Sequence, residues 1–199
     1  MEKLILATKN RGKIIELSDL LKELPIELIS LLDFDFPDIE ETGLTFAENA
    51  AIKAKAVYAK TGIPCIADDS GLEIDALDGN PGVMSARFAG AHGDDTANNN
   101  KVLELMAGIP VAKRTARFRC ALAMVGLTDE PYITSGICEG FIATAPEGDN
   151  GFGYDPLFWV TDFGKTMAEL TLEEKNLISH RAIAFKKVSA EITRLLLWR

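Results

Sequence analysis

Short strand-like segments alternate with helical patterns through the first half of the sequence, and this alternation favours an α/β fold. Residues 3–7 are short and β-prone, and apolar residues within 14–21 recur at helical spacing. Residues 26–30 predict a second strand. Thr45 and Glu48 form a capping box that opens an Ala-rich helix reaching about residue 60. We therefore expect a central mixed sheet flanked by helices.

The rest of the chain adds further strands and helices. Residues 65–67 predict a short strand that runs into Asp68, and Asp94 or Asp95 can cap a helix to about residue 106. Residues 115–125 and 132–143 are rich in β-compatible residues. Two helices complete the pattern, one opened by a capping box at Thr171 and Glu174 and the last carrying an apolar stripe of Phe185, Val188, Ile192 and Leu195.

The composition is that of a globular protein, with 47% hydrophobic and 26% charged residues, and a length of 199 residues suits one domain spanning 1–199. The net charge of −9 argues against a nucleic-acid-binding protein, which needs a basic face, but a pocket for a small anion can still be locally basic. No apolar run approaches the roughly 20 residues of a membrane span, and no signal-peptide pattern precedes the first strand. We expect no membrane partner and a cytoplasmic location.

Cysteine and histidine usage narrows the chemistry further. Cys65, Cys120 and Cys138 are odd in number and far apart, which predicts buried free thiols and no disulfide framework. The two histidines, His92 and His180, are too few for a His-rich metal site. The sequence therefore predicts neither a disulfide framework nor a His-rich metal site.

The segment from Thr8 to Lys13 lies between the first predicted strand and the first predicted helix. A loop that opens a helix presents unpaired backbone N–H groups and the positive end of the helix dipole, which together favour phosphate. Gly12 allows tight backbone geometry, and Lys13 adds a mobile cation. The spacing is not that of a Walker A loop, and many strand-to-helix turns carry a Gly and a Lys without binding phosphate.

Two adjacent carboxylates, Asp68 and Asp69, lie where a buried strand is expected to end. Adjacent carboxylates repel each other unless a cation or hydrogen-bond donors compensate, although alternation along a strand need not point both the same way. Glu40 and Glu41 lie in another loop, and carboxylates from separate loops make a hard-oxygen site suited to Mg²⁺. The alternative is an Asx-turn into Gly71 with no metal.

Three further segments carry candidate ligand-binding residues. Asn49 and Lys53 share a helix face as i and i+4. Between Gly151 and Pro156, two glycines let the backbone pass close to a ligand and an aromatic ring can lie against a base, while a tight turn with buried aromatics is the alternative. Arg181 falls in the first turn of the last helix, where the dipole disfavours a cation. Either it donates to a ligand or another chain, or it is a flexible surface side chain.

Together these segments resemble the inosine-triphosphate pyrophosphatase family, which hydrolyses non-standard purine nucleoside triphosphates. The resemblance covers nearly the whole chain and depends on the joint order and spacing of these segments: Thr8-Lys9-Asn10 with Lys13, Glu40 to Gly43, Glu48-Asn49-Ala50 with Lys53-Ala54, Ala67 to Leu72, Gly82 with Ser85-Ala86-Arg87, Gly151 to Pro156, and Ile178 to Arg181. Two positions depart from the pattern. Lys9 stands where the family often has Gly, which puts the phosphate affinity in question, and Met84 stands where an aromatic is common.

The resemblance implies a two-lobed α/β fold with a nucleotide cleft between the lobes, Mg²⁺ dependence and a homodimer. It implies Asp69 as metal ligand and general base, with Lys13 and Lys53 as the other catalytic groups. Glu40, Glu41 and Asp68 are the further candidate metal ligands. The predicted substrate-binding residues are Thr8, Lys9, Asn10, Arg11, Gly12, Lys13, Asn49, Lys53, Ser70, Phe152, Gly153, Tyr154, Asp155, Lys175, His180 and Arg181, of which Phe152, Tyr154, Asp155, Lys175, His180 and Arg181 would form the base pocket.

The predicted reaction is the hydrolysis of ITP, dITP and XTP to the nucleoside monophosphate and pyrophosphate, which would sanitise the nucleotide pool. Water would attack the α-phosphorus, and Mg²⁺ and the lysines would neutralise the developing charge. Two other functions remain open. One is a non-catalytic nucleotide sensor, against which the acidic cluster argues, because carboxylates near phosphate need an intervening metal. The other is a phosphotransferase, for which no acceptor-site motif is visible.

Overall fold

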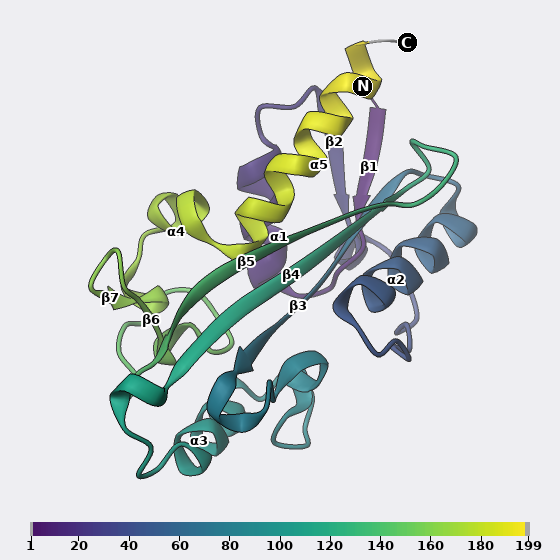
Figure 1. Cartoon of the computed structure of the whole chain (residues 1–199). Helices are drawn as coiled ribbons and strands as arrows, with labels where there is room; N and C mark the ends of the chain where they lie inside the picture. Colours follow the sequence, from purple (N-terminus) through teal and green to yellow (C-terminus); the bar gives the residue numbers. More distant parts are fainter. Residues whose placement is uncertain (1, 198–199) are drawn as a thin grey trace. The chain divides into compact units, whose positions relative to one another are not determined.

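The computed structural model describes residues 2–197 and has an α/β fold built on one sheet (Figure 1). The strands are β1 (Glu2–Leu6), β2 (Ile26–Ser30), β3 (Cys65–Ile74), β4 (Thr115–Val125), β5 (Tyr132–Ile142), β6 (Phe158–Val160) and β7 (Lys165–Thr166). The α-helices are α1 (Arg11–Leu21), α2 (Phe46–Thr61), α3 (Asp95–Leu105), α4 (Leu172–Ile178) and α5 (His180–Leu197). Within residues 2–197, no helix combines the length and the apolar character that crossing a membrane requires.

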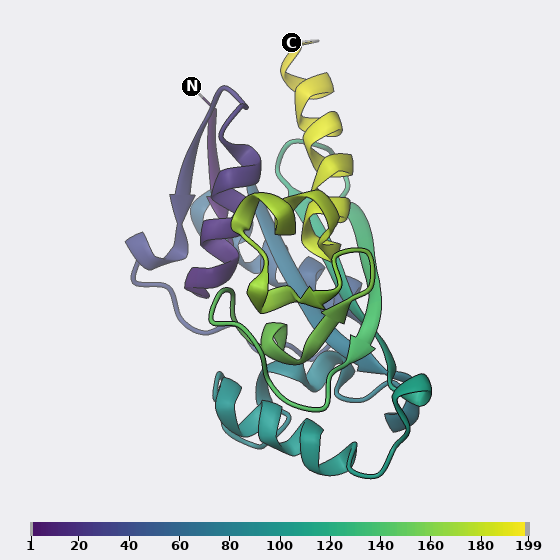
Figure 2. The same cartoon turned by 90° about the vertical axis from the view of Figure 1, so that its left-hand side faces the viewer.

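The sheet is mixed, as the sequence predicts. Its strand order is β2-β1-β3-β4-β5-β6-β7. β1 pairs in parallel with β2 and β3, whereas β6 pairs antiparallel with β5 and β7. Figure 2 shows β1 and β2 side by side, with α1 next to them. The parallel pairs follow from the helical crossovers α1 and α2, which return the chain to the same end of the sheet.

The chain divides into two compact units, each with its own hydrophobic core. Unit 1 consists of Met1–Asp69, Cys120–Gly136 and His180–Arg199, and unit 2 of Ser70–Arg119 and Ile137–Ser179. The strands β3, β4 and β5 each contribute residues to both units. The predicted α/β fold class is therefore confirmed.

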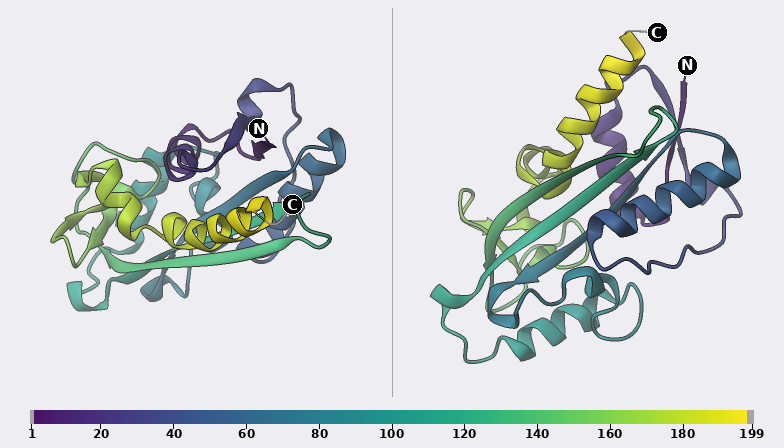
Figure 3. Two further views of the ribbon diagram at one scale, coloured as in Figure 1. Left: turned by 90° about the horizontal axis from the view of Figure 1, so that it is seen from above. Right: turned by 45° about the vertical axis from the view of Figure 1, so that its right-hand side comes forward.

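In unit 1, α1 and α5 bury their apolar faces together against the strands. Leu17 and Leu21 of α1 join Phe185, Val188 and Ile192 of α5 in one cluster, which confirms the apolar stripe predicted for the last helix. The view from above shows α5 lying along β5 (Figure 3, left). The approach is close, because a Cβ at residue 136 would collide with the carbonyl of His180, and only glycine fits there.

Helix α2 packs on the opposite face of the same strands (Figure 1). Ile66 belongs to the cluster formed with α1 and α5, whereas the thiol of its neighbour Cys65 donates to the carbonyl of Ala54 in α2 over 3.1 Å. Successive side chains of a strand point to opposite faces, so this part of β3 lies between two helical layers. The predicted capping box of α2, Thr45 with Glu48, is confirmed.

Unit 2 has a second core, formed by residues of β3, β4, β5 and α3 and by the segment from residue 154 to residue 170. The predicted cap of α3 is Asp94, whose carboxylate accepts from the N–H of Ala97 over 2.9 Å. Arg114 is buried, and its guanidinium donates to the carbonyls of Met106, Ile142 and Ala143 over 2.7–2.8 Å. These bonds satisfy backbone groups at the end of α3 and beside β5.

Two boundaries differ from the sequence prediction, and both affect the site. The prediction that the strand ends before Asp68 is wrong, because β3 continues to Ile74 and contains both acids. The acids are tolerated there because each has a cationic partner. The helix α1 begins at Arg11, so Gly12 and Lys13 lie in its first turn and not in the preceding loop.

Candidate active site

The two adjacent acids of β3 point to opposite faces of the sheet. Asp68 follows the alternation of Ile66 towards α1 and α5, and Asp69 follows that of Cys65 towards α2. Both residues are buried, at 1% and 6% exposure. A buried carboxylate needs charged or hydrogen-bonding partners, and the two acids have entirely different ones.

Asp69 faces Lys53 of α2. The Lys53 ammonium lies 3.1 Å from Asp69 Oδ1 and 2.7 Å from Glu41 Oε1, so one cation joins two carboxylates. The lysine side chain is only 12% exposed. Glu41 is half-buried and its neighbour Glu40 is exposed, so the structure brings Glu41 and not Glu40 to this cluster.

Burial changes the protonation behaviour of this group. Desolvation raises the pKa of Asp69 above its ordinary value, even though Lys53 and Lys13 act to lower it, and Glu41 adds to the rise. Desolvation alone would lower the pKa of Lys53, but the nearby carboxylates outweigh it and the pKa of Lys53 is raised. Lys53 therefore stays protonated, while Asp69 becomes a better proton acceptor than an exposed aspartate.

Asn49 lies one helical turn before Lys53 and fixes the loop that carries Glu41. Its Oδ1 accepts from the N–H of Gly43 over 2.8 Å. Its Nδ2 is buried and has no hydrogen-bond partner. A buried amide donor without a partner is costly, so this Nδ2 is a candidate donor to a ligand.

Asp68 is the centre of a buried charge network on the α1 and α5 side. Its carboxylate is ion-paired with Lys13 of α1 and accepts from Arg181 Nε of α5 over 2.9 Å. Arg181 Nη1 is in turn paired with Glu16 of α1. The thiol of Cys120 in β4 donates to Asp68 Oδ2 over 3.2 Å, and burial with the nearby carboxylate raises the thiol pKa.

The alternation of two cations and two carboxylates makes this network neutral overall. Desolvation opposes a charged Arg181, but Asp68 and Glu16 more than compensate and raise its pKa. Arg181 is 1% exposed, so it is not a surface side chain, and the structure shows why a cation lies in the first turn of α5. Its position depends on two carboxylates from other elements.

The segment before α1 holds the remaining residues predicted on the phosphate side. Asn10 caps the helix, with its Oδ1 accepting from the N–H of Lys13 over 3.0 Å, and Thr8 Oγ1 accepts from the N–H of Asn10 over 3.1 Å. Lys9 and Arg11 are exposed, and the Lys9 ammonium lies 2.7 Å from Asp38 Oδ1. Side chains thus order the turn that precedes the positive end of α1.

Unit 2 contains a separate group of the predicted base-binding residues. Asp155 and Lys175 form a buried ion pair, and the Lys175 ammonium lies 5.1 Å from the centre of the Phe152 ring. The N–H of Phe152 donates to Asp155 Oδ2 over 3.0 Å. Tyr154 is buried and its hydroxyl donates to the carbonyl of Ser85 over 2.8 Å. An aromatic face beside a paired charge suits a planar, polar ligand.

Backbone bonds to α3 fix the glycine-containing loop in this group. The N–H of Gly153 donates to Asp95 Oδ2 over 2.7 Å, and Asn99 Nδ2 donates to the Gly153 carbonyl over 2.8 Å. Gly151 has a positive φ of 77°, and a Cβ there would collide with the Asp155 carboxylate. Of the other predicted residues, Ser70 is half-buried in β3 and His180 is buried at the start of α5.

The sequence comparisons assign the chain to a known group of proteins. The model of the Ham1 family matches residues 4–191. The chain belongs to the Ham1 family. The family resemblance read from the sequence motifs is thereby confirmed.

Relatives in the Ham1 family match almost end to end. A dITP/XTP pyrophosphatase of Geobacillus kaustophilus is 50% identical over 192 residues, which are 96% of this chain and 94% of the relative. A dITP/XTP pyrophosphatase of Desulforamulus reducens is 51% identical over 194 residues, which are 97% of this chain and 96% of the relative. The solved structure of a HAM1 protein from Coxiella burnetii superposes with a TM-score of 0.87 at 45% identity, covering 98% of this chain and all of that one.

The sequence patterns did not indicate four residues that contact predicted site residues within their own unit. Glu16 and Cys120 contact the Asp68 network, and Asp95 and Asn99 fix the Gly153 loop. Only Glu16 carries a signal, because it lies three residues after Lys13, at a spacing that places an acid beside a lysine on one helix. The others depend on contacts between elements far apart in the sequence.

The donor set of the Asp69 face is compatible with a magnesium ion. Within residues 2–197, no group of three or more His, Cys, Asp or Glu side chains is arranged to hold a metal. Glu41 and Asp69 form a pair, however, and Asp69 Oδ2 is buried without a hydrogen-bond partner. Mg²⁺ is usually bound by one or two carboxylates together with substrate phosphates and water, so a pair is sufficient.

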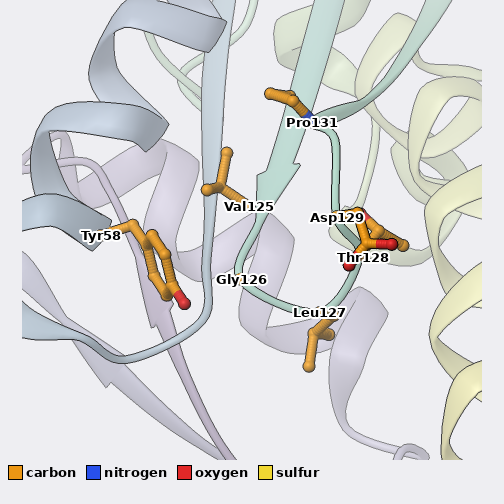
Figure 4. Close-up of a pocket in the computed structure, with 7 residues that line it drawn as sticks. All are labelled: Tyr58, Val125, Gly126, Leu127, Thr128, Asp129 and Pro131. Carbon is orange, nitrogen blue, oxygen red and sulfur yellow. The ribbon is translucent and has the colours of Figure 1, made fainter.

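A hollow elsewhere in unit 1 is not part of this site. It has a volume of about 370 Å³ and is lined by Tyr58 of α2, the end of β4 and the turn before β5 (Figure 4). The lining residues are Tyr58, Val125, Gly126, Leu127, Thr128, Asp129 and Pro131. None of the predicted catalytic, metal-binding or substrate-binding residues is among them.

Proposed function

We propose that the whole chain, residues 1–199, is one nucleoside-triphosphate pyrophosphatase domain that hydrolyses dITP, XTP and ITP to the monophosphate and pyrophosphate. The observation that carries the proposal is the group of Glu41, Lys53 and Asp69, in which a buried carboxylate with a raised pKa lies beside a second carboxylate and a lysine. The relatives named dITP/XTP pyrophosphatase support the choice of substrates. Sanitising the nucleotide pool is the cellular purpose that follows.

Glu41 and Asp69 are the residues that would hold Mg²⁺, and Glu40 is the weaker candidate because it is exposed. The ion would supply positive charge to the phosphate oxygens, where negative charge develops during hydrolysis. Asp68 is paired with Lys13 and Arg181, so we propose a positioning role for it and not a ligand role. In this role Asp68 fixes Lys13 at the start of α1.

Asp69 is the proposed general base. Its carboxylate accepts a proton from the attacking water as the bond between the water oxygen and the α-phosphorus forms. The bond between the α-phosphorus and the bridging oxygen breaks, and pyrophosphate leaves with that electron pair. A base is most effective when its pKa lies near the working pH, and burial shifts the pKa of Asp69 in this direction.

The phosphates would lie at the positive end of α1, against Lys13, Lys53 and the turn of Thr8 to Gly12. The base would lie against Phe152 and Lys175, with Tyr154, Asp155 and Gly153 shaping the pocket. Arg181 contacts Asp68 and Glu16 through its guanidinium, so we propose that it supports Asp68 while Lys175 becomes the leading candidate for reading the base. Asn49, Ser70 and His180 remain proposed contacts.

One experiment tests the function against its alternatives. Purified protein with Mg²⁺ is incubated with a panel of ITP, dITP, XTP, ATP and GTP, and monophosphate, pyrophosphate and phosphate are measured separately. The proposal expects monophosphate and pyrophosphate in equal amounts from the inosine and xanthosine nucleotides. Binding without any product would indicate a nucleotide sensor, and transfer to an added acceptor would indicate a phosphotransferase.

Replacing Lys13 is expected to weaken triphosphate binding selectively. Lys13→Ala removes a charged hydrogen bond to the phosphates, worth about 1.5–3 kcal/mol, so the Kd for ITP should rise by roughly 10- to 150-fold. Inosine monophosphate lacks the distal phosphate charges, so its Kd should rise much less. Lys22→Ala, which replaces an exposed lysine at the C-cap of the same helix, is the control. Equal losses for mono- and triphosphate, measured by calorimetry, would contradict the phosphate clamp.

A homodimer is the proposed assembly, and it rests on the family resemblance. Light scattering at micromolar concentration should give about twice the 21.6 kDa mass of the chain. A monomer under these conditions would remove the dimer from the proposal and leave the chemistry untouched. A cytoplasmic location is also proposed, supported by three free, buried thiols that suit a reducing compartment.

A further inference from the structure

Lys53 lies between the two carboxylates that the proposed function assigns to the metal. Its ammonium contacts one oxygen of each, at 2.7 Å from Glu41 Oε1 and 3.1 Å from Asp69 Oδ1. The three side chains are 12%, 25% and 8% exposed, so the cluster is largely shielded from water. A single positive charge therefore already joins the carboxylates that a divalent cation would join.

We propose that Lys53 and the metal compete for Glu41 and Asp69, and that metal binding releases the Lys53 ammonium from this pair. The inference rests on the proposed function, because that function supplies the metal. Two like charges repel strongly when they share ligands in a poorly solvated site. The ammonium is the mobile partner, since it ends a flexible four-carbon side chain, whereas the short side chain of Asp69 is held on β3.

The geometry also leaves one carboxylate oxygen to which the metal can bind first. Asp69 Oδ2 is buried and without a hydrogen-bond partner, so this oxygen is available while Lys53 still holds Oδ1. Lys53 shares its helix face with Asn49, whose Nδ2 also has no partner. After its release, the Lys53 ammonium and the unpaired Asn49 Nδ2 would together offer two donors to phosphate oxygens. Competition at the carboxylates thus makes Lys53 available at the moment when metal is present.

The first test measures the affinity for metal alone. Mn²⁺ is titrated into the wild-type protein, Lys53→Met and Lys55→Met, and free Mn²⁺ is followed by electron paramagnetic resonance. Lys53→Met should bind Mn²⁺ about tenfold more tightly than wild type, within the usual range for two events coupled through one group. Lys55→Met removes the same charge from an exposed position of the same helix, and its affinity should change little.

The second test needs no variant and therefore does not depend on the folding of Lys53→Met. Wild-type protein is partially acetylated with and without Mg²⁺, and the modification of each lysine is quantified by mass spectrometry. Mg²⁺ should raise the acetylation rate of Lys53 several-fold, because the released ammonium loses two carboxylate partners. The acetylation rate of the exposed Lys55 of α2 should not change.

The outcomes separate this inference from the proposed function. If Lys53→Met binds Mn²⁺ no more tightly than wild type, or if Mg²⁺ leaves the acetylation of Lys53 unchanged, the competition does not exist. Hydrolysis of ITP with Mg²⁺ would then still support the proposed function. If no nucleotide is hydrolysed, the proposed function fails, while tighter Mn²⁺ binding by Lys53→Met and faster labelling of Lys53 would still support the competition.

Discussion

Asp69→Asn is expected to lower the turnover of ITP by at least ~100-fold, the low end for the loss of a general base. The amide keeps the size of the side chain and can still accept from Lys53, but it cannot take a proton from water and binds Mg²⁺ poorly. The stability of the fold should not decrease. Because burial raises the pKa of Asp69, the ionised carboxylate is held in the native state at a cost, and a neutral amide removes this cost.

The measurement combines steady-state kinetics with thermal unfolding. The melting temperature of Asp69→Asn should be equal to or slightly above that of the wild type. Glu130→Gln, an exposed acid in the turn between β4 and β5, is the matched control and should keep both turnover and stability. Turnover near the wild-type value in Asp69→Asn would remove Asp69 from the mechanism.

Arg181→Met is expected to lower the free energy of unfolding by about 3–5 kcal/mol, the usual cost of removing one partner from a buried ion pair. Methionine fills much of the volume but leaves Asp68 and Glu16 facing each other without the cation between them. Lys13 would remain the charged partner of Asp68. The variant should therefore fold at low temperature and unfold at much lower denaturant concentration.

Urea unfolding followed by circular dichroism measures this effect. Arg194→Met provides the control on the same helix. Arg194 is exposed and forms an ion pair with Glu191, three residues earlier, and an ion pair of this kind contributes little to stability. Its unfolding curve should overlay that of the wild type. If Arg181→Met were as stable as Arg194→Met, the buried network would not stabilise unit 1, and a direct role of Arg181 in base recognition would become the better explanation.

Both predictions follow from one property of β3. Adjacent acids would repel each other if they shared a face, but alternation gives each its own cation, Lys53 for Asp69 and Lys13 with Arg181 for Asp68. One acid therefore stays accessible to chemistry in a site with a second carboxylate. The other is committed to a neutral network that fixes α1 and α5 to the sheet. We expect loss of activity from changes at the first and loss of stability from changes at the second.

The sequence alone determined the local elements and the chemical character of the site. The capping boxes at Thr45 and Thr171, the cap at Asp94 and the apolar stripe of α5 were all predictable, because each depends on residues within a few positions of one another. The residue types in the site, lysines and carboxylates, indicated phosphate and a hard cation.

Only the tertiary structure decided which groups meet. It extended β3 through both acids, brought Glu41 and not Glu40 to Lys53, and enclosed Arg181 between Asp68 and Glu16. These contacts join residues 12 to 165 positions apart, and their geometry depends on how α1, α2 and α5 pack on the two faces of the sheet. A local pattern states what a side chain can do, but the partner that satisfies a buried charge is set by the packing of distant elements, which no local pattern contains.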